Sequence, residues 1–145
     1  MKNLFLFLTF SITSLTYSQT ILFQEYYEGT LDNKTKIFFY FKMAEDGCPS
    51  TYVHAIYKYA TNKNNDWILL ETTFSEEKQQ YTLVEHYNTG LFLLKRDKGK
   101  LFGLWISPDG KKQLKVDLTK VKVPKSKIET LERQLEIEQY KAHDC

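Results

Sequence analysis

Residues 80–106, QYTLVEHYNTGLFLLKRDKGKLFGLWI, decide the fold class, because apolar residues recur at alternate positions in three short runs. The runs are separated by Asn-Thr-Gly at residues 88–90 and Asp-Lys-Gly at residues 97–99. Asn, Asp and Gly tolerate the positive φ that tight hairpin turns require. Alternation with a period of two between such turns is typical of antiparallel β-strands. The stretch therefore predicts strands at residues 80–87, 91–95 and 101–106.

The same rhythm runs through most of the chain. Further alternating segments occupy residues 23–31, 36–43, 52–59, 67–73 and 113–121. Eight consecutive antiparallel strands with short connections can close on themselves, which removes both exposed edges of the sheet. We therefore predict an eight-stranded antiparallel up-and-down β-barrel, with a two-sheet β-sandwich as the alternative.

The period changes after Pro124, where a helical pattern begins. Ser126 and Glu129 have the spacing of a capping box, in which both side chains satisfy free amides at a helix start. Apolar residues then recur at helical spacing on one narrow stripe: Ile128, Leu131, Leu135 and Tyr140. The pattern predicts a C-terminal helix and tail over residues 124–145, packed on one mouth or the outside of the barrel. A helix that binds a partner or forms a dimer is the alternative.

The first 18 residues have the layout of a secretory signal peptide. Lys2 precedes an apolar core at residues 4–10, and small or polar residues lead to Ser18. That core is too short to span a bilayer, and no later segment is apolar enough to do so. We expect cleavage between Ser18 and Gln19, a secreted or periplasmic protein without an integral membrane segment, and a barrel domain over residues 19–123.

The charge balance argues against nucleic-acid binding. The chain has 20 Lys and Arg against 18 Asp and Glu, which leaves it close to neutral. Affinity for nucleic acid comes from neutralising phosphates and needs a basic stripe. The lysines within residues 111–125 are spaced one residue in two or three, which is typical of a solvated strand face.

Two cysteines, Cys48 and Cys145, raise the question of a disulfide. In an oxidising compartment the two could pair and tie the C-terminal tail to the turn at residues 46–49. Separate, unpaired thiols are the alternative. We expect no metal site and no cofactor, because neither cysteine has a second Cys or His at ligand spacing except His143 beside Cys145 at the chain end.

Alternation along the strands assigns an inner face to the barrel. We expect these residues to point inward: Tyr27, Leu31, Ile37, Phe39, Phe41, Val53, Ala55, Tyr57, Tyr59, Ile68, Leu70, Tyr81, Leu83, Glu85, Phe92, Leu94, Leu101, Trp105, Leu114, Val116 and Leu118. Most of this set is core. An apolar wall with a few convergent polar groups is the usual makeup of a ligand pocket. The candidate ligand-binding residues are therefore Tyr57, Tyr59, Glu85 and Trp105, and the alternative places their polar tips in water at the rim.

Several short segments follow one another in a recognisable order: YYEGTL at residues 26–31, VHAIYKY at 53–59 and LFGLW at 101–105. In this the chain resembles a group of small secreted β-barrel proteins of Bacteroidetes-type bacteria, whose strand order is similar to that of avidin-like and lipocalin-like barrels. The resemblance implies the barrel and the export. It carries over no binding residue, and Ala55 and Thr72 stand where the group tends to have Gly.

We find no catalytic signature. The sequence lacks a Gly-x-Ser-x-Gly elbow, a His-Glu-x-x-His pair and a phosphate loop, and its three histidines are far apart. We therefore expect a non-catalytic protein that binds an unidentified small ligand or a protein partner. A barrel that holds a small apolar or amphipathic ligand predicts a cavity lined by the four candidate residues. An interaction module, such as an inhibitor of an extracellular or lytic enzyme, predicts a filled interior and an exposed loop or helix face.

Overall fold

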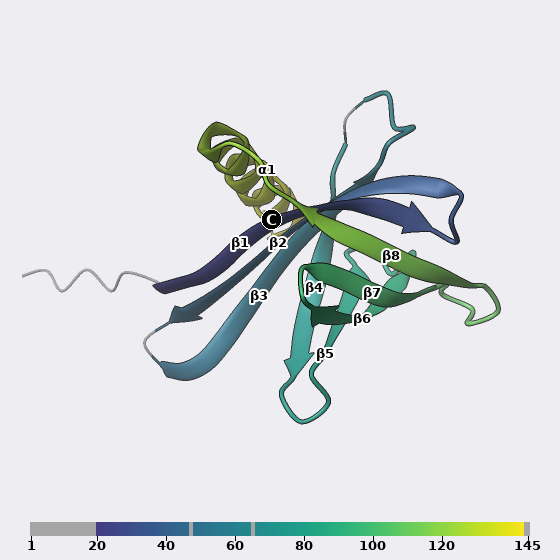
Figure 1. Cartoon of the computed structure of the whole chain (residues 1–145), viewed down its shortest axis with the longest axis horizontal. Coiled ribbons are helices and arrows are strands. Elements are labelled where there is room, and N and C mark those ends of the chain that lie inside the picture. Colours follow the sequence, from purple (N-terminus) through teal and green to yellow (C-terminus); the bar gives the residue numbers. More distant parts are fainter. Residues whose placement is uncertain (1–19, 47, 65, 144–145) are drawn as a thin grey trace, which may run out of the picture.

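The computed structural model describes residues 20–143 apart from Gly47 and Asn65, and the side chains of residues 46–50 lie outside that description. Eight strands precede one helix along the chain (Figure 1). The strands are β1 (Thr20–Leu31), β2 (Thr35–Asp46), β3 (Cys48–Tyr59), β4 (Ile68–Ser75), β5 (Gln80–Glu85), β6 (Leu91–Asp97), β7 (Lys100–Ile106) and β8 (Gln113–Val121). The helix is α1 (Lys125–His143).

The strands form a closed barrel in the order of the sequence, and every neighbouring pair is antiparallel. The up-and-down barrel is confirmed, and the sandwich alternative is not adopted. The first three strands are longer than predicted, at 12 residues each. As a result β1, β2 and β3 extend beyond the shorter strands at one end of the barrel (Figure 1). Residues 48 and 49, expected in the turn at residues 46–49, belong to β3.

The barrel interior is filled by the predicted inward residues. All of them belong to one core cluster or pack against it, except Glu85, which is buried as well. Aromatic rings occupy the centre, where Phe92 meets Phe39 edge to face with ring centroids 5.8 Å apart. Tyr57 contacts Phe92 in the same manner at 5.0 Å. An eight-stranded barrel is just wide enough for side chains to fill it.

Helix α1 packs on the outside of the barrel, over β1, β3 and β4 (Figure 1). Leu131 and Leu135 are buried in a second apolar cluster with outward-facing residues of the strands. Glu132 accepts hydrogen bonds from the Tyr40 hydroxyl at 2.5 Å and from Lys42. Burial would raise the pKa of Glu132, but these two donors lower it. The helix is therefore held by an apolar stripe and by one paired carboxylate.

Two details of the helix prediction are wrong. Tyr140, assigned to the buried stripe, is 68% exposed, because the side of α1 that faces the barrel continues from Leu135 to Ala142 and Tyr140 lies off it. The helix also begins at Lys125, so that Ser126 and Glu129 lie inside its first turns. The Pro124 carbonyl accepts from the Lys127 amide instead, and Glu129 pairs with Lys125 at 3.7 Å.

Some predictions fall outside the described residues. These are the signal peptide at residues 1–18, with its cleavage site, and the disulfide between Cys48 and Cys145. Within residues 20–143, leaving aside 47 and 65, no helix combines the length and the apolar character that crossing a membrane requires.

Gly29 allows β1 to approach β8 closely. A Cβ atom at this position would overlap the backbone carbonyl oxygen of Asp117. We expect Gly29→Ala to lower the free energy of unfolding by about 2 kcal/mol, because β8 must shift away from β1. Urea unfolding followed by circular dichroism measures the change. Thr30→Ala, one residue along on the same strand, is the control, and an equal loss in both variants would contradict the close approach.

Candidate functional site

The four predicted site residues come together at one end of the barrel. Tyr57 and Tyr59 lie at the end of β3, Glu85 lies at the end of β5, and Trp105 lies near the end of β7. Glu85 is 4% exposed, and its Oε1 accepts from the Tyr57 hydroxyl at 2.5 Å and from Trp105 Nε1 at 2.8 Å. The Tyr57 and Tyr59 hydroxyls are 3.2 Å apart. The predicted convergence of these residues is therefore present in the structure.

The donors around Glu85 satisfy its carboxylate within the protein. The second oxygen, Oε2, accepts from the Thr89 hydroxyl in the following turn. Gly90 lies against the indole of Trp105, where a Cβ atom would overlap the ring. Burial, and then the hydrogen bond to Glu85, raises the pKa of the Tyr57 hydroxyl, which keeps it a donor. The network thus closes this end of the barrel with polar groups that pair with one another.

Tyr57, Tyr59, Glu85 and Trp105 do not line the three main hollows of the described structure. Each of those hollows lies on the outer surface or between strands, and other residues line it. Binding of a small ligand by the four residues therefore stays a prediction.

Removing the Glu85 carboxylate tests the strength of this network. Glu85→Ala leaves the Tyr57 hydroxyl and the Trp105 N–H without their acceptor, and we expect a loss of about 3 kcal/mol in the free energy of unfolding. Glu85→Gln keeps one acceptor oxygen and should lose about 1 kcal/mol. Denaturant unfolding followed by tryptophan fluorescence measures both. If the Ala variant is as stable as the Gln variant, the hydrogen bonds to Glu85 do not stabilise this end.

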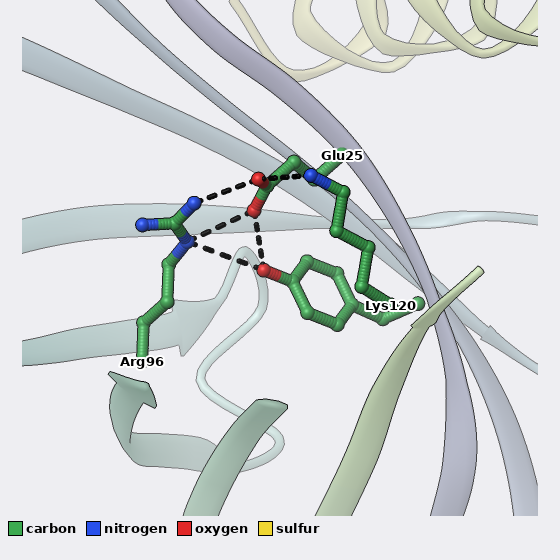
Figure 2. A network of polar contacts seen from close by, with 4 residues as sticks. Glu25, Arg96 and Lys120 are labelled. Carbon is green, nitrogen blue, oxygen red and sulfur yellow. Dashed lines mark hydrogen bonds and ion pairs between the residues drawn. The ribbon is translucent and has the colours of Figure 1, made fainter. Parts of the chain in front are cut away.

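A second network closes the opposite end of the barrel. Glu25 of β1 lies between Arg96 of β6 and Lys120 of β8 (Figure 2). Arg96 donates to both carboxylate oxygens, from Nη2 at 2.7 Å and from Nε at 2.9 Å. Lys120 Nζ donates to Oε1 at 2.6 Å, and the Tyr27 hydroxyl donates to Oε2 at 2.5 Å. One buried carboxylate therefore ties three strands together.

The cations determine the charge state of Glu25. Burial alone would raise its pKa, since only 4% of the residue is exposed. The hydrogen bonds from Arg96, Lys120 and Tyr27 outweigh burial and hold the pKa at about 2. The carboxylate is therefore ionised at any ordinary pH, and its charge is matched by two cations that reach the solvent.

The sequence interpretation missed this network, although the same alternation contains it. Glu25 lies two residues before Tyr27, Arg96 two after Leu94 and Lys120 two after Leu118, so each continues an inward-facing series. On these three strands the predicted inward set begins at Tyr27 and ends at Leu94 and Leu118, so it leaves out the charged residue next in each series. The sequence signal for this network was an acidic residue at an inward position of one strand, Glu25, with basic residues at inward positions of two others, Arg96 and Lys120.

The pKa of Glu25 predicts an acid-dependent stability. Because the folded pKa of about 2 lies below the ordinary 4.5, the ionised group stabilises the fold above pH 4.5. This stabilisation is lost as the pH falls through about 2. We expect Glu25→Gln to cost about 2 kcal/mol at neutral pH and almost nothing at pH 2.

Urea unfolding at the two pH values measures this difference. Glu28→Gln is the matched control, because the Glu28–Lys36 ion pair, 3.0 Å long, is partly exposed. The control should lose about 0.5 kcal/mol or less. A cost for Glu25→Gln that does not change with pH would contradict the role of the charge.

Strands β3 and β4 pair over a short length only. Three residue pairs join them, from Ala55–Leu70 to Tyr57–Ile68. Beyond Ala55, β3 continues beside β2 as far as Cys48, and β4 continues beside β5 as far as Ser75. The two strands therefore diverge, as Figure 1 shows. We call the opening between residues 51–54 of β3 and residues 71–74 of β4 the β3–β4 seam.

Backbone groups on both sides of the seam point into it. The Ala60 amide donates toward β2, to the Lys36 carbonyl, and the Leu69 carbonyl accepts from His86 next to β5. Successive residues of a strand direct their backbone groups to alternate sides. Counting along β3 from Ala60, the backbone groups of Thr51 and Val53 therefore point into the seam. Counting along β4 from Leu69, those of Thr72 and Phe74 do so as well. Each has no partner strand across the opening.

The seam holds a groove of about 450 Å³. Its lining combines apolar side chains of the core edge, such as Val53 and Phe74, with polar ones on the outside, such as His54 and Glu71. Gln139 and His143 of α1 border it. The Thr72 hydroxyl donates to the Leu70 carbonyl at 3.0 Å, at the point where pairing with β3 ends. A smaller hollow of about 130 Å³ adjoins the other side of α1 and shares Leu69.

The histidines lie around the end of α1. Gln139 contacts His54 Nδ1 at 3.0 Å, and burial, followed by the charge of Lys42, lowers the pKa of His54. Glu71 pairs with His86 at 3.2 Å and lies 3.9 Å from His143. In the described part of the chain, no three His, Cys, Asp or Glu side chains are grouped so that they could hold a metal ion.

Comparison of the chain with models of protein families, with curated proteins and with solved structures found no match in any of the three.

Proposed function

We propose that the protein is an exported, non-catalytic interaction module that holds an extended segment of a partner protein in the β3–β4 seam. The observation that carries the proposal is the pair of strand edges that face each other across the groove without pairing. Unpaired strand edges are templates for another strand, and proteins usually shorten, charge or cover them. Addition of a strand at such an edge is an established mode of peptide recognition.

The filled interior favours this class over a ligand-holding barrel. Aromatic side chains occupy the centre, and the two polar networks use their own donors and acceptors at both ends. Both of these features limit the space and the free polar groups for a small molecule inside. The groove in the seam, in contrast, combines free backbone groups with apolar and polar side chains.

The lining specifies the chemistry of the segment. Since β3 and β4 are antiparallel, an inserted strand runs antiparallel to one of them and parallel to the other. Its inward side chains would meet Val53 and Phe74, and its outward side chains would meet His54 and Glu71. The preferred segment therefore alternates apolar and polar residues, with the polar side chains on the face toward α1.

Peptide binding to the seam can be measured without knowledge of the natural partner. Random peptides displayed on phage are selected against residues 19–145, and the selected peptides are synthesised. We expect the seam amides of Val53 and Thr72 to exchange at least about tenfold faster than the paired amide of Ala55 in the free protein. Bound peptide should slow the exchange of both seam amides.

Two variants accompany the exchange measurement. Thr72→Pro removes one seam amide, and we expect it to weaken peptide binding at least about tenfold. Tyr140→Ser changes an exposed residue of α1 that does not line the groove and should leave binding unchanged. Peptides that bind without protecting Val53 or Thr72, or seam amides that are already protected in the free protein, would sink the proposal.

A further inference from the structure

The outer face of β5, β6 and β7 carries an apolar patch. In register, Leu91 lies beside Val84 on one side and Ile106 on the other, and Leu93 lies beside Leu104. Phe102 and Leu104 are 39% and 38% exposed. We call these residues, together with Lys95 of β6 and Lys115 of the adjoining strand β8, the β5–β7 face. Soluble proteins rarely leave a contiguous apolar patch in water unless it meets something.

The helix gives a comparison for this face. On β1 to β4, outward apolar residues such as Tyr40 and Ile56 are fully buried, because α1 packs on that side of the barrel. The residues of the β5–β7 face have the same outward orientation but remain half-buried or exposed. The barrel thus has one covered apolar side and one uncovered one.

Positive charge is concentrated around the uncovered side. Residues 91–122 have nine Lys or Arg and three Asp, a net charge of +6, whereas residues 20–90 have a net charge of −4 from six Lys and ten Asp or Glu. Arg96 and Lys120 point inward to Glu25. Six of the remaining seven lysines lie on the outer face or in the adjoining turns, and all six are exposed: Lys95, Lys98, Lys100, Lys111, Lys112 and Lys115. The seventh, Lys122, is exposed in the connection between β8 and α1.

We propose that the β5–β7 face is a peripheral docking surface for an anionic lipid bilayer. The charge complementarity identifies an anionic partner, and the exposed Phe102 and Leu104 identify one with an apolar layer beneath its charges. Protein interfaces are enriched in Arg, Tyr and Trp and depleted in Lys. The outward cations here are all lysines around an apolar centre, and long Lys side chains can hold their charges at the headgroups while the apolar centre enters the interface.

Phosphate binding by nucleic acid would use the lysines alone. A duplex presents no apolar layer, so Phe102 and Leu104 would stay in water. The bilayer accounts for both the charged rim and the apolar centre of the face. This inference rests on a different side of the barrel from the seam and does not depend on strand addition there.

Vesicle sedimentation tests the docking. Protein comprising residues 19–145 is mixed with vesicles of phosphatidylcholine and phosphatidylglycerol, and separately with vesicles of phosphatidylcholine alone. We expect binding to the anionic vesicles that weakens as salt is added, and little binding to the neutral ones. Lys95→Glu combined with Lys112→Glu and Lys115→Glu should lower the partition coefficient at least about tenfold.

A matched triple variant separates this face from net charge. Lys34, Lys63 and Lys78 are exposed lysines on the acidic part of the barrel, and changing all three to Glu gives the same change in charge. That control should keep most of the binding. Phe102→Ser with Leu104→Ser should weaken vesicle binding while the free energy of unfolding stays close to that of the parent.

Four results would overturn the proposal. The first is an equal loss of vesicle binding in both triple variants, and the second is binding to neutral vesicles as tight as binding to anionic ones. The third is binding to a DNA duplex that equals or exceeds vesicle binding at the same salt concentration, and the fourth is no binding to vesicles at all. Sedimentation velocity distinguishes a further case. A dimer that dissociates in the Phe102→Ser, Leu104→Ser variant would assign the face to a second copy of the chain and not to lipid.

Discussion

Pairing of β1 with β8 is the interaction on which the rest of the structure depends. Six residue pairs, from Tyr26–Val121 to Leu31–Val116, join the first strand to the last and close the barrel. Closure places every inward side chain opposite others across a narrow interior, which the aromatic residues then fill. It also requires β1 and β8 to approach closely at Gly29, where a side chain would meet the backbone of Asp117.

Closure gives each end of the barrel a buried carboxylate with donors from several strands. At one end Glu85 joins β5 to Tyr57 of β3 and Trp105 of β7. At the other, Glu25 joins β1 to Arg96 of β6 and Lys120 of β8. Burying a carboxylate is costly unless other groups compensate it. Glu25 is paired with two cations, and Glu85 accepts hydrogen bonds from three neutral donors. The two networks hold non-adjacent strands together, so they compensate in part for the few pairs between β3 and β4.

The consequence for function is that free binding groups lie on the surface and in the seam. The inner residues use their polar atoms on one another, whereas the seam keeps strand edges open and the β5–β7 face keeps apolar side chains in water. The two surfaces differ in chemistry as well. The seam lies between strands of the acidic part of the chain, whereas the β5–β7 face has exposed lysines beside it and in the adjoining turns. The proposed partner segment and the proposed bilayer would therefore contact different strands of the barrel.

Local patterns in the sequence determined the number of strands, their order along the chain and the side chains that face inward, because alternation with period two is a property of each strand by itself. The same alternation contained Glu25, Arg96 and Lys120, but their meeting depends on barrel closure, which brings β1, β6 and β8 to one end. The seam had no local signal, since β3 and β4 both have good strand patterns and only their relative tilt in the closed barrel separates them. The position of α1 and the exposure of Tyr140 were likewise decided by tertiary packing, because a helical stripe does not specify which outer face it covers or which residues at its margin make contact.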